Sequence, residues 1–336
     1  MRFDSRSSPA AAEPTSRVAP GPDRITLAVS LGDPRGIGAE VAAAAAGQLR
    51  DRPDSPYLLL VGPRGTAADE AGDRFLPIGQ WHTSGTAADA GRLAADAVRT
   101  AAELALAGEV DGIVTAPLDK AALHAAGFPW PGHTEMLASL AGDRAVAMMM
   151  CAESNAHGGP LRVVLATVHI PLRDVPAALT ADRLVEQCRI TAGALRRDWD
   201  IASPRLALCA FNPHASDQGL FGDEEARIYG PALERLAADG VDARGPFPAD
   251  TVFVRALRGE FDVVIAPYHD VGMAAFKTAS FGRGVNVTLG LPFVRTSPDH
   301  GTALDIAGRG IADASSMVEA IALAATLAAR RAARAR

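Results

Sequence analysis

Cysteine, aromatic residues and excess positive charge are all scarce in this sequence. Its 336 residues include three cysteines, Cys151, Cys188 and Cys209, and no CxxC pair. A disulfide framework is therefore not expected, and the usage fits a reducing compartment such as the cytoplasm. Aromatic residues make up 5% of the chain, so we expect a core built mainly from Ala, Val and Leu, with the cysteines buried in it.

The charge balance and the lack of long apolar runs narrow the possible partners. The net charge is -6 and the pI is near 5.8, so the chain lacks the basic footprint of a nucleic-acid-binding protein. No run of about 18 apolar residues occurs, and we expect no membrane-spanning helix. Residues 1–23 are rich in Pro, Ala and Ser without the apolar segment of a signal peptide. We interpret them as a disordered extension.

The GxGxxG fingerprint of a dinucleotide-binding Rossmann domain is also absent. The ordered chain nevertheless begins with an apolar strand, Ile25–Leu31, which runs into the turn GDPRGIGAE and then into an Ala-rich helix. A strand, a Gly-rich turn and a helix in this order present backbone N–H groups to an anion or a nucleotide. A plain tight turn is the alternative interpretation, because Gly and Pro mark turns of many kinds.

Apolar strands and amphipathic helices alternate along the rest of the chain. The pattern predicts strands at 57–62, 111–117, 145–151, 161–170, 205–211, 241–246 and 261–267, and helices at 86–107, 118–127, 180–197, 250–259 and 315–334. Such alternation is typical of an α/β fold with mainly parallel sheets.

Three histidines occupy the same position in this pattern. His169, His214 and His269 each lie just beyond the C-terminal end of an apolar strand, where open α/β sheets collect their ligands. They are 45 and 55 residues apart, which excludes the local spacing of a zinc finger but allows three strand ends to converge. Three imidazoles with an open position describe a catalytic zinc site. A structural role for each histidine taken alone is the competing interpretation.

The stretch Tyr268–Gly310 is unusually dense in polar groups set between glycines. Lys277, Arg283 and Arg295 follow the third histidine among glycine and apolar residues rather than on a charged helix. We interpret the stretch as one wall of an active site, in which these cations hold a phosphate or a carboxylate.

Two strings resemble known nucleotide-binding segments. DHGTALDIAGRG resembles the nucleotide loop of the isocitrate and isopropylmalate dehydrogenases, and GDPRGIGAE resembles their GDGIGPE turn. The further strings VTAPLDK, GHTEMLA, HIPLRDV, NPHAS, PADTVF, YHD and FGRGVNVTLGLPFVRTSPDHGTA extend the likeness from about Ile25 to Ala329. The chain resembles the 4-hydroxythreonine-4-phosphate dehydrogenase family of vitamin B6 biosynthesis.

The resemblance implies a fold and a reaction. The fold is two α/β/α domains with a cleft between them, as in isocitrate dehydrogenase: a nucleotide-side domain of residues 24–135 plus 296–336, and a metal, substrate and dimerisation domain of residues 136–295. The reaction is oxidation of 4-phosphooxy-L-threonine by NAD or NADP, followed by loss of CO₂ to give 3-amino-2-oxopropyl phosphate. The family is a homodimer with shared sites and a divalent metal, most often Zn²⁺, with Mg²⁺ or Co²⁺ as alternatives.

The resemblance also assigns residues. The metal ligands map to His169, His214 and His269, and the substrate-binding residues to His133, Thr134, Asp250, Lys277, Asn286 and Arg295. The nucleotide-binding residues map to Gly32, Asp33, Asp299, His300, Gly301, Thr302 and Asp305. The general base stays open among Lys120, Asp270 and His133.

Two segments depart from the family pattern, and they leave the substrate open. They are the bend Val271–Ser280 after YHD and the DQGLFG loop after NPHAS. The alternatives are a sister dehydrogenase of 4-phosphothreonate, 4-phosphoerythronate or an aromatic cis-dihydrodiol carboxylate, and a non-catalytic protein that binds a metabolite or a metal. The intact GHTE string and the Lys, Asn and Arg set favour a phosphorylated substrate.

Overall fold

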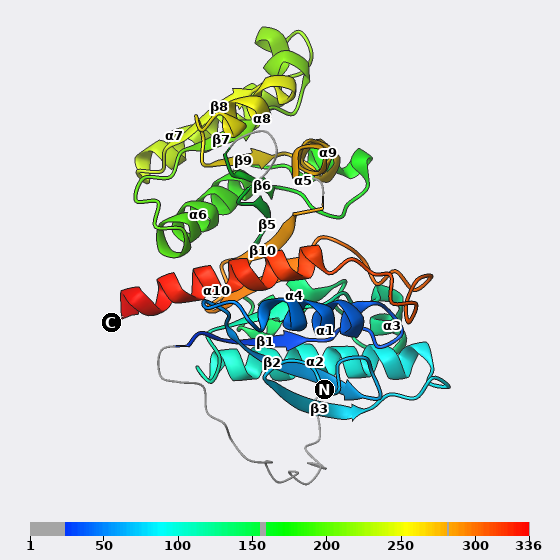
Figure 1. Ribbon diagram of the computed structural model, residues 1–336. Coiled ribbons are helices and arrows are strands. Elements are labelled where there is room, and N and C mark those ends of the chain that lie inside the picture. Colours follow the sequence, from blue (N-terminus) through cyan, green and yellow to red (C-terminus); the bar gives the residue numbers. More distant parts are fainter. Residues whose placement is uncertain (1–23, 155–158, 281, 336) are drawn as a thin grey trace.

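One twisted sheet of eleven strands runs through both lobes of the molecule (Figure 1). The computed structural model describes residues 24–154, 159–280 and 282–335, so the extension predicted at residues 1–23 lies outside the described residues. The strand order is β3-β2-β1-β4-β11-β10-β5-β6-β9-β7-β8. Strands β1 to β4 belong to the lower lobe in Figure 1 and β6 to β9 to the upper one, with β10 and β5 between them.

The strands are parallel at both ends of the sheet and antiparallel at its centre. They are β1 Thr26–Ser30, β2 Tyr57–Arg64, β3 Arg74–Gln80, β4 Gly112–Thr115, β5 Ala147–Ala152, β6 Leu161–Leu165, β7 Leu206–Cys209, β8 Ala243–Phe247, β9 Val263–Ala266, β10 Val285–Leu289 and β11 Val294–Pro298. Strand β10 is antiparallel to β11 and β5, and β5 is antiparallel to β6. The predicted α/β fold with a mainly parallel sheet is confirmed, although β3, β10 and β11 were not predicted.

The helices cover both faces of the sheet. They are α1 Gly38–Leu49, α2 Ala87–Leu106, α3 Lys120–Ala125, α4 His133–Leu140, α5 Val175–Ala178, α6 Ala181–Asp198, α7 Gly230–Ala238, α8 Ala249–Leu257, α9 His269–Ser280 and α10 Ser315–Ala335, with short turns η1 Leu172–Asp174, η2 Pro213–Gly219 and η3 Glu225–Tyr229. Within the described ranges, no helix has both the length and the apolar character needed to cross a membrane.

Side-chain caps fix the first residues of helices α2 and α6. Thr86 accepts a hydrogen bond from the backbone N–H of Asp89, whose carboxylate accepts one from the backbone of Thr86. Thr180 caps α6 in the same way by accepting from the backbone of Arg183. Such caps satisfy N–H groups that have no partner inside the helix. The ends of α2 and α6 therefore lie within a residue of those predicted from the sequence.

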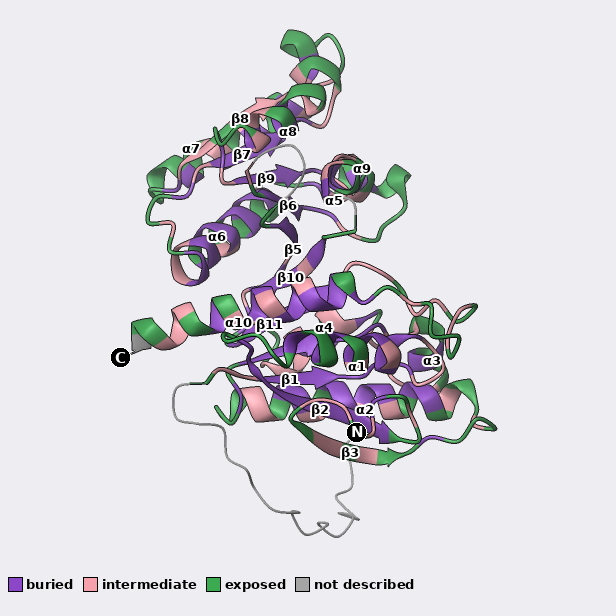
Figure 2. Ribbon diagram, in the orientation of Figure 1, coloured by how far each residue is buried: buried purple, intermediate pink, exposed green. Residues whose placement is uncertain are grey.

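The apolar core is continuous on one face of the sheet and interrupted on the other. On the first face, α1, α6 and α10 cover one cluster that extends from Val29 of β1 to Val164 of β6. On the second face, α2 and α4 cover a cluster around Ile113, and α8 and α9 cover a separate cluster around Phe276. Figure 2 shows the buried strands running through both lobes. The interruption leaves the second face of β10 and β11 without an apolar cover.

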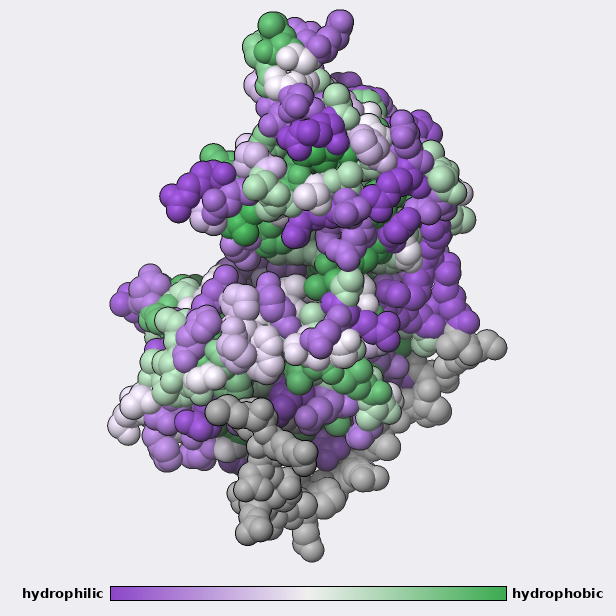
Figure 3. Space-filling view, turned by 180° about the vertical axis from the view of Figure 1, so that it is seen from behind, coloured by the Kyte–Doolittle hydropathy of each residue, from purple (hydrophilic) through white to green (hydrophobic). Residues whose placement is uncertain are grey.

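An ion-pair cluster joins the lobes at the end of the sheet where α6 and α10 terminate. Asp198 is 2% exposed and accepts hydrogen bonds from Arg331 at 2.6 and 2.8 Å and from Arg197 at 2.8 and 2.9 Å. Seen from behind, the surface narrows between the lobes and mixes polar with apolar residues (Figure 3). The proposed domain boundaries at residues 135 and 296 stay a prediction.

The bend predicted at Val271–Ser280 is wrong, because these residues belong to α9. Their buried positions, Gly272, Met273 and Phe276, recur at helical spacing. A Cβ on Gly272 would lie 2.6 Å from a methyl carbon of Leu165. Glycine therefore lets the helix lie close against β6, and the polar side chains of the helix are carried on its open face.

Candidate active site

A cavity of about 1100 Å³ opens where the second face of the sheet lacks its apolar cover, between α4 and α9. The structure brings eleven of the predicted site residues to its wall: Lys120, His133, Thr134, His169, His269, Lys277, Asn286, Arg295, Asp299, His300 and Gly301. They come from both lobes and from the loop that follows β11. The predicted convergence of strand ends is therefore found for two of the three histidines.

The floor of the cavity follows from strand register. Asn286 of β10 pairs with Ser297 of β11, and Arg295 lies two residues before Ser297. Because side chains alternate between the faces of a strand, these three side chains share one face. The intervening Val287 belongs to the apolar cluster of the other face. A short antiparallel pair thus lays three polar side chains side by side between the lobes.

Arg295 is buried without a carboxylate partner. It is 2% exposed, and its partners are the hydroxyls of Thr288 at 2.9 Å and Thr115 at 2.7 Å. Burial lowers the pKa of this guanidinium to about 10, and the negative charge of Glu135 opposes that effect. The Nε–H group of this guanidinium has no hydrogen-bond partner in the structure. A cation in this state is suited to bind an anion.

His133 stands beside this cation as a neutral imidazole. The ring nitrogen Nε2 is shielded from water, although other atoms of the residue reach the surface. Desolvation holds the pKa of His133 well below its usual range, and the positive charges of Arg295 and Lys120 lower it further. The residue begins α4 directly after the N-cap Gly132, so the helix starts two residues earlier than it would if Thr134 were the N-cap.

Unpaired polar atoms are concentrated in the cavity. Of the seven shielded side-chain atoms without a hydrogen-bond partner in the described residues, five belong to residues that line it: His133 Nε2, Gln187 Oε1, Asn286 Oδ1, Arg295 Nε and His300 Nε2. Leaving such an atom unpaired costs about 1–3 kcal/mol. This concentration indicates a cavity whose wall is completed by a polar ligand.

Gln187 was missed by the sequence analysis. It lies within α6, is 6% exposed and donates a hydrogen bond from Nε2 to the backbone oxygen of Val146 at 3.3 Å. That bond fixes the amide orientation and leaves Oε1 as an acceptor. A glutamine inside an amphipathic helix carries no signal of such a role, and only the packing of α6 brings it to the cavity wall.

Two histidines form the part of the cavity suited to a metal. The ring centroids of His169 and His269 are 5.4 Å apart. His269 Nδ1 lies 2.7 Å from Asp270 Oδ1. Because the carboxylate only accepts, Nδ1 donates the proton of this hydrogen bond, and Nε2 is the nitrogen left to face a metal, as in metal-bound histidines. Burial lowers the pKa of His169, with Lys120 contributing in the same direction, so this imidazole is neutral.

His214, the third predicted metal ligand, does not line this cavity. Its ring centroid is 6.4 Å from that of Phe221, and it starts a run of five non-glycine residues, His214–Gln218, whose φ angles lie between 43° and 74°. A left-handed turn of this kind is strained for L-residues. Among the described residues, no group of three or more His, Cys, Asp or Glu is arranged to hold a metal. The three-histidine site stays a prediction.

The strained turn has a rigid support. The carboxylate Oε1 of Glu225 accepts hydrogen bonds from the backbone of Asn212 at 2.7 Å and of Phe211 at 3.0 Å. The Asn212 side chain donates to Glu225 and to Glu224. Beyond the turn, Leu220 is 71% exposed. These hydrogen bonds fix the backbone that leads into the turn of His214, and the exposed Leu220 follows that turn in the sequence.

Two of the residues predicted to bind substrate or to act in catalysis, Asp250 and Asp270, do not line the cavity. Asp250 is exposed in the first turn of α8, and Asp270 is 85% exposed and paired with His269. Of the three candidates for the general base, Lys120 and His133 line the cavity, whereas Asp270 contacts a histidine that does. The position of Asp270 suits orientation of that imidazole better than proton transfer.

The two segments predicted to bind a nucleotide lie against each other. The backbone N–H of Ile37 donates to the oxygen of Thr302 at 3.0 Å, and that of Gly308 donates to Glu40 Oε2 at 3.1 Å. A Cβ on Gly36 would lie 2.6 Å from the oxygen of Thr302, so glycine is needed for this approach. The other carboxylate oxygen of Glu40 is shielded and unpaired, which suits a bound group with hydroxyl donors such as ribose.

Individual residues of these segments differ in their availability. The carboxylate of Asp33 is fully buried and accepts three hydrogen bonds from Arg35, at 2.6, 2.9 and 3.0 Å. Its role is to shape the turn after Gly32, whose φ is +69°. Asp305 is exposed and does not line the cavity. His300 lines it, and its Nε2 is unpaired.

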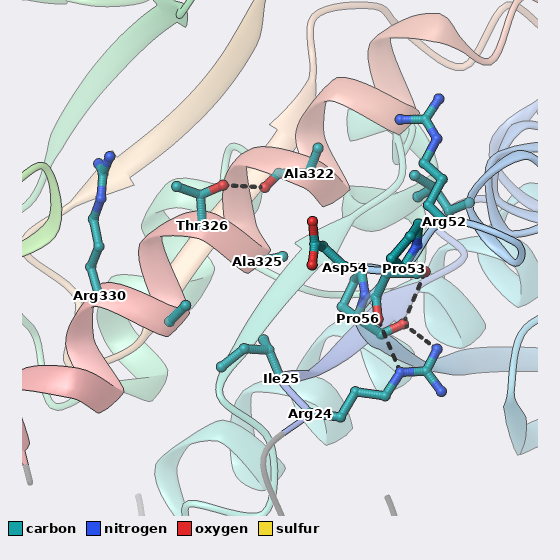
Figure 4. Close-up of a pocket in the computed structure, with 13 residues that line it drawn as sticks. Arg24, Ile25, Arg52, Pro53, Asp54, Pro56, Ala322, Ala325, Thr326 and Arg330 are labelled. Carbon is teal, nitrogen blue, oxygen red and sulfur yellow. Dashed lines mark hydrogen bonds between the residues drawn. The ribbon is translucent and has the colours of Figure 1, made fainter. Parts of the chain in front are cut away.

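A second cavity of similar size, about 1120 Å³, lies between residues 49–56 and α10. Figure 4 shows that its polar groups bond to one another: Arg24 donates to the backbone oxygens of Ser55 and Pro56, and Thr326 donates to that of Ala322. Arg52 and Arg330 lie on opposite sides of the view, well separated from each other. Its hydrogen bonds are satisfied locally, and it contains none of the five unpaired atoms described above. The cavity between α4 and α9 is therefore the candidate active site.

Comparisons with known proteins identify the family of this chain. The sequence profile of the family described as pyridoxal phosphate biosynthetic protein PdxA matches residues 63–324. The 4-hydroxythreonine-4-phosphate dehydrogenase of Paracoccus denitrificans is 45% identical over 323 residues, covering 91% of this chain and 98% of that protein. The crystal structure of the enzyme of that name from Klebsiella pneumoniae superposes with a TM-score of 0.80 at 37% identity, over 92% of this chain and 99% of the other.

A relative with a different substrate is more distant. The crystal structure of a terephthalate 1,2-cis-dihydrodiol dehydrogenase from Burkholderia xenovorans superposes with a TM-score of 0.62 at 28% identity, covering 90% of this chain and 98% of that one.

Proposed function

Because the chain belongs to the family of the pyridoxal phosphate biosynthetic protein PdxA, we propose that the cavity between α4 and α9 oxidises 4-phosphooxy-L-threonine. The product, 2-amino-3-oxo-4-phosphooxybutanoate, decarboxylates to 3-amino-2-oxopropyl phosphate. The protein is a dehydrogenase acting on a CH–OH group in pyridoxal phosphate biosynthesis. The observation that carries the assignment of the site is the concentration of unpaired polar atoms and buried positive charge in this one cavity.

Three side chains are suited to hold the anionic groups of the substrate. Arg295 offers an unpaired Nε and an unneutralised charge, Lys277 offers a mobile ammonium 56% exposed, and Asn286 offers an unpaired Oδ1 to a hydrogen-bond donor. An ammonium and a guanidinium in one cavity match a substrate with both a phosphate and a carboxylate. The neutral His133 then contacts the substrate without adding a third cation.

The glycine turn after β1 and the loop after β11 would hold a nicotinamide cofactor, NAD or NADP. The turn Gly32–Gly38 and the loop Asp299–Asp305 meet through the Ile37–Thr302 hydrogen bond. The unpaired atom of His300 lies in this loop, and that of Glu40 lies in the first turn of α1, directly after the glycine turn. When bound, the nicotinamide accepts the hydride that leaves the substrate. The protein's part is to fix the orientation of the two reactants.

His169 and His269 would hold a divalent metal, Zn²⁺ first and Mg²⁺ or Co²⁺ as alternatives. When bound, such an ion stabilises the substrate alkoxide and polarises the ketone that decarboxylates. His169, whose pKa is lowered by burial, and His269, whose Nδ1 is hydrogen-bonded to Asp270, suit this role. Lys120 lines the same cavity and is the candidate to receive the hydroxyl proton.

His214 of a second subunit would complete this set in a homodimer. His214 does not line the cavity of its own chain, and the strained turn that carries it is followed by Leu220, which is 71% exposed. Leu172, 65% exposed, lies next to the His169–His269 pair. Two apolar surfaces, each beside an incomplete histidine set, support a shared site. We place the protein in the cytoplasm, which its buried free cysteines support.

A sister activity has one specific observation in its favour. The segment Val271–Ser280, which departs from the family pattern, forms α9, and Met273, Ala274, Lys277 and Thr278 of this helix line the cavity. Sequence differences in this segment therefore change the part of the cavity wall that would contact the substrate. The cationic residues favour a phosphorylated acid over a dihydrodiol carboxylate among these alternatives.

A substrate panel tests the proposed function directly. Purified protein with Zn²⁺ is assayed for NADH and NADPH formation with 4-phosphooxy-L-threonine, 4-phosphothreonate, 4-phosphoerythronate and terephthalate cis-dihydrodiol. We expect turnover with the first compound at the highest kcat/KM. A higher kcat/KM for any of the others would reassign the substrate, and no reduction of either nucleotide would reject the dehydrogenase.

Complementation tests the shared histidine site. His169→Ala and His214→Ala variants are each expected to lose activity as homodimers. In a mixed dimer, one of the two sites would receive all three histidines, so mixing after reversible dissociation should restore activity. A mixed dimer as inactive as its parents would show that His214 serves the cavity of its own chain or no cavity at all.

A further inference from the structure

The guanidinium of Arg295 is held by hydroxyl groups from both neighbouring strands. Strand β11 lies between β4 and β10 in the sheet. Thr115 of β4 accepts a hydrogen bond from Nη2 at 2.7 Å, and Thr288 of β10 accepts one from Nη1 at 2.9 Å. Both threonines are buried, with exposures of 0% and 3%. The two terminal nitrogens of the fork are therefore tied in opposite directions along the floor of the cavity.

This arrangement follows from strand register. Arg295 pairs with Ile113 across β11 and β4, and Thr115 lies two residues beyond Ile113 on the same face. On the other side, Thr288 lies two residues beyond the cavity-lining Asn286, so it shares that face as well. The sheet itself brings both hydroxyls within reach of one guanidinium, and neither threonine depends on a loop for its position.

The chemistry of the two partners matters for the charge of Arg295. A carboxylate would also accept from the guanidinium, but it would neutralise the charge and compete with a substrate anion. A hydroxyl oxygen accepts the N–H and leaves the charge in place. Both hydrogen-bond partners of Arg295 in the described residues are hydroxyls. The fork is thus fixed in orientation while its charge stays available.

We propose that Thr115 and Thr288 are positioning residues that hold the Arg295 fork flat on the cavity floor, with its charge and its unpaired Nε directed to the anionic group of the substrate. The identity of that anion rests on the proposed function, whereas the arrangement itself rests on the geometry. Fixing the fork before binding lowers the ordering cost that the ligand would otherwise bear.

Paired substitutions test the proposal. Thr115→Val and Thr288→Val keep the side-chain shape and remove the acceptor, whereas Thr115→Ser and Thr288→Ser keep the hydroxyl. Thr296→Val is the matched control: Thr296 is buried on β11, but its hydroxyl donates to the backbone of Ala320 in α10, on the opposite face. Melting temperatures establish that each variant is folded, and the control reports the cost of losing a buried hydroxyl of the same sheet.

The readouts are the Kd of inorganic phosphate, measured by calorimetry, and the kcat and KM for 4-phosphooxy-L-threonine. We expect each valine variant to raise the Kd and the KM by roughly tenfold, because a hydrogen bond to a charged group is lost. The serine variants keep the acceptor and Thr296→Val changes the opposite face, so all three should stay within about twofold of the wild type. The KM for the nucleotide should not change in any variant.

A double-mutant cycle with Arg295→Met separates positioning from general packing. If the threonines act through Arg295, Thr115→Val in the Arg295→Met background weakens phosphate binding no further. Fully additive effects, or valine variants that bind phosphate as the wild type does, would overturn the proposal. Wild-type protein that fails to turn over the substrate but shows the expected phosphate pattern would reject the proposed function alone.

Discussion

Lys277 of α9 and Asp299 after β11 face each other at the cavity, with Nζ 3.4 Å from Oδ1. Burial raises the pKa of Asp299, and the ammonium of Lys277 opposes that shift. The pair joins a residue predicted to bind substrate to one predicted to bind nucleotide. Lys277 is 56% exposed, so its flexible stem can exchange Asp299 for a substrate anion. We therefore expect the binding of substrate and of nucleotide to be coupled at this side chain.

Removing this ammonium should weaken substrate binding. We expect Lys277→Met to raise the KM for 4-phosphooxy-L-threonine by roughly ten- to hundredfold, because a charge-assisted contact is lost. Steady-state kinetics measure the change. Arg283→Met is the matched control, since Arg283 is a nearby cation that does not line the cavity and lies 3.5 Å from the hydroxyl of Ser154. Equal effects of the two substitutions would show that only the overall charge matters.

The contact between the glycine turn and the nucleotide loop gives a second prediction. Gly36→Ala would place a Cβ 2.6 Å from the oxygen of Thr302 and force the two segments apart. Overpacking of this kind costs about 1–3 kcal/mol, and we expect the KM for NAD or NADP to rise by about tenfold or more.

Gly47→Ala, in the helix that follows this turn, provides the comparison. A Cβ there meets no atom within 4 Å, and Gly47 is exposed in α1. This variant should gain about 0.5–1 kcal/mol of stability from the helix propensity of alanine, with unchanged kinetics. A Gly36→Ala enzyme with a wild-type nucleotide KM would contradict a nucleotide site at this contact.

Asp198 should make a large contribution to stability. Asp198→Asn removes the negative charge that pairs with Arg331 and Arg197, and breaking a buried pair costs about 3–5 kcal/mol. Urea unfolding measures the loss. Asp182→Asn is the control, because its ion pair with Arg235 lies on the surface, where Asp182 is 86% exposed; such pairs contribute about 0–1 kcal/mol.

The same residue predicts a pH dependence. Burial raises the pKa of Asp198, but hydrogen bonds from Arg331 and Arg197 outweigh it and hold the pKa below its usual value of 3.8. A depressed carboxyl pKa gives stability that is complete above the unfolded pKa and is lost as the pH falls through the folded pKa. The difference between wild type and Asp198→Asn should therefore be constant from about pH 5 to 7 and shrink below about pH 4. A difference that persists unchanged to pH 2 would exclude the ionised carboxylate as its source.

Metal removal is the last test of the histidine pair. Dialysis against a chelator should abolish substrate-dependent NADH formation, and Zn²⁺ or Co²⁺ should restore it. His169→Ala should bind less than one equivalent of Zn²⁺ under conditions that saturate the wild type. Full turnover in protein shown by elemental analysis to be metal-free would contradict the role of His169 and His269.

The local patterns of the sequence predicted the parts of this fold that depend on local chemistry. Alternation and helical periodicity predicted α2, α6 and most of the parallel strands, and the caps that begin the two helices, Thr86 and Thr180, also act within three residues of themselves. Strands β10 and β11 were missed, since VNVTL and VRTSP carry polar residues at alternate positions and are enclosed by glycines. Their pairing depends on β4 and β5, more than 130 residues away in the chain.

The site shows the same division. Arg295, His133 and the pair His169 and His269 were found from motifs and strand ends, and the structure brings them to one cavity. The contributions of Thr115, Thr288 and Gln187 were not predicted, because no local pattern distinguishes a threonine that supports an arginine from one that packs a strand. Such roles depend on side-chain contacts between strands that only the folded sheet creates.

The continuous sheet has a mechanical consequence for the two lobes. Strand β10 pairs with β5 over five consecutive residues, Val285–Leu289 with Ala147–Cys151, and both strands stand between the lobes rather than in a flexible linker. A change in the angle between the lobes must therefore twist these strands and tilt the side chains that they carry. Asn286 sits on this flexing element and Arg295 on the strand beside it. Any change in the angle between the lobes would thus also move Asn286 and Arg295, the side chains that we propose to bind the substrate.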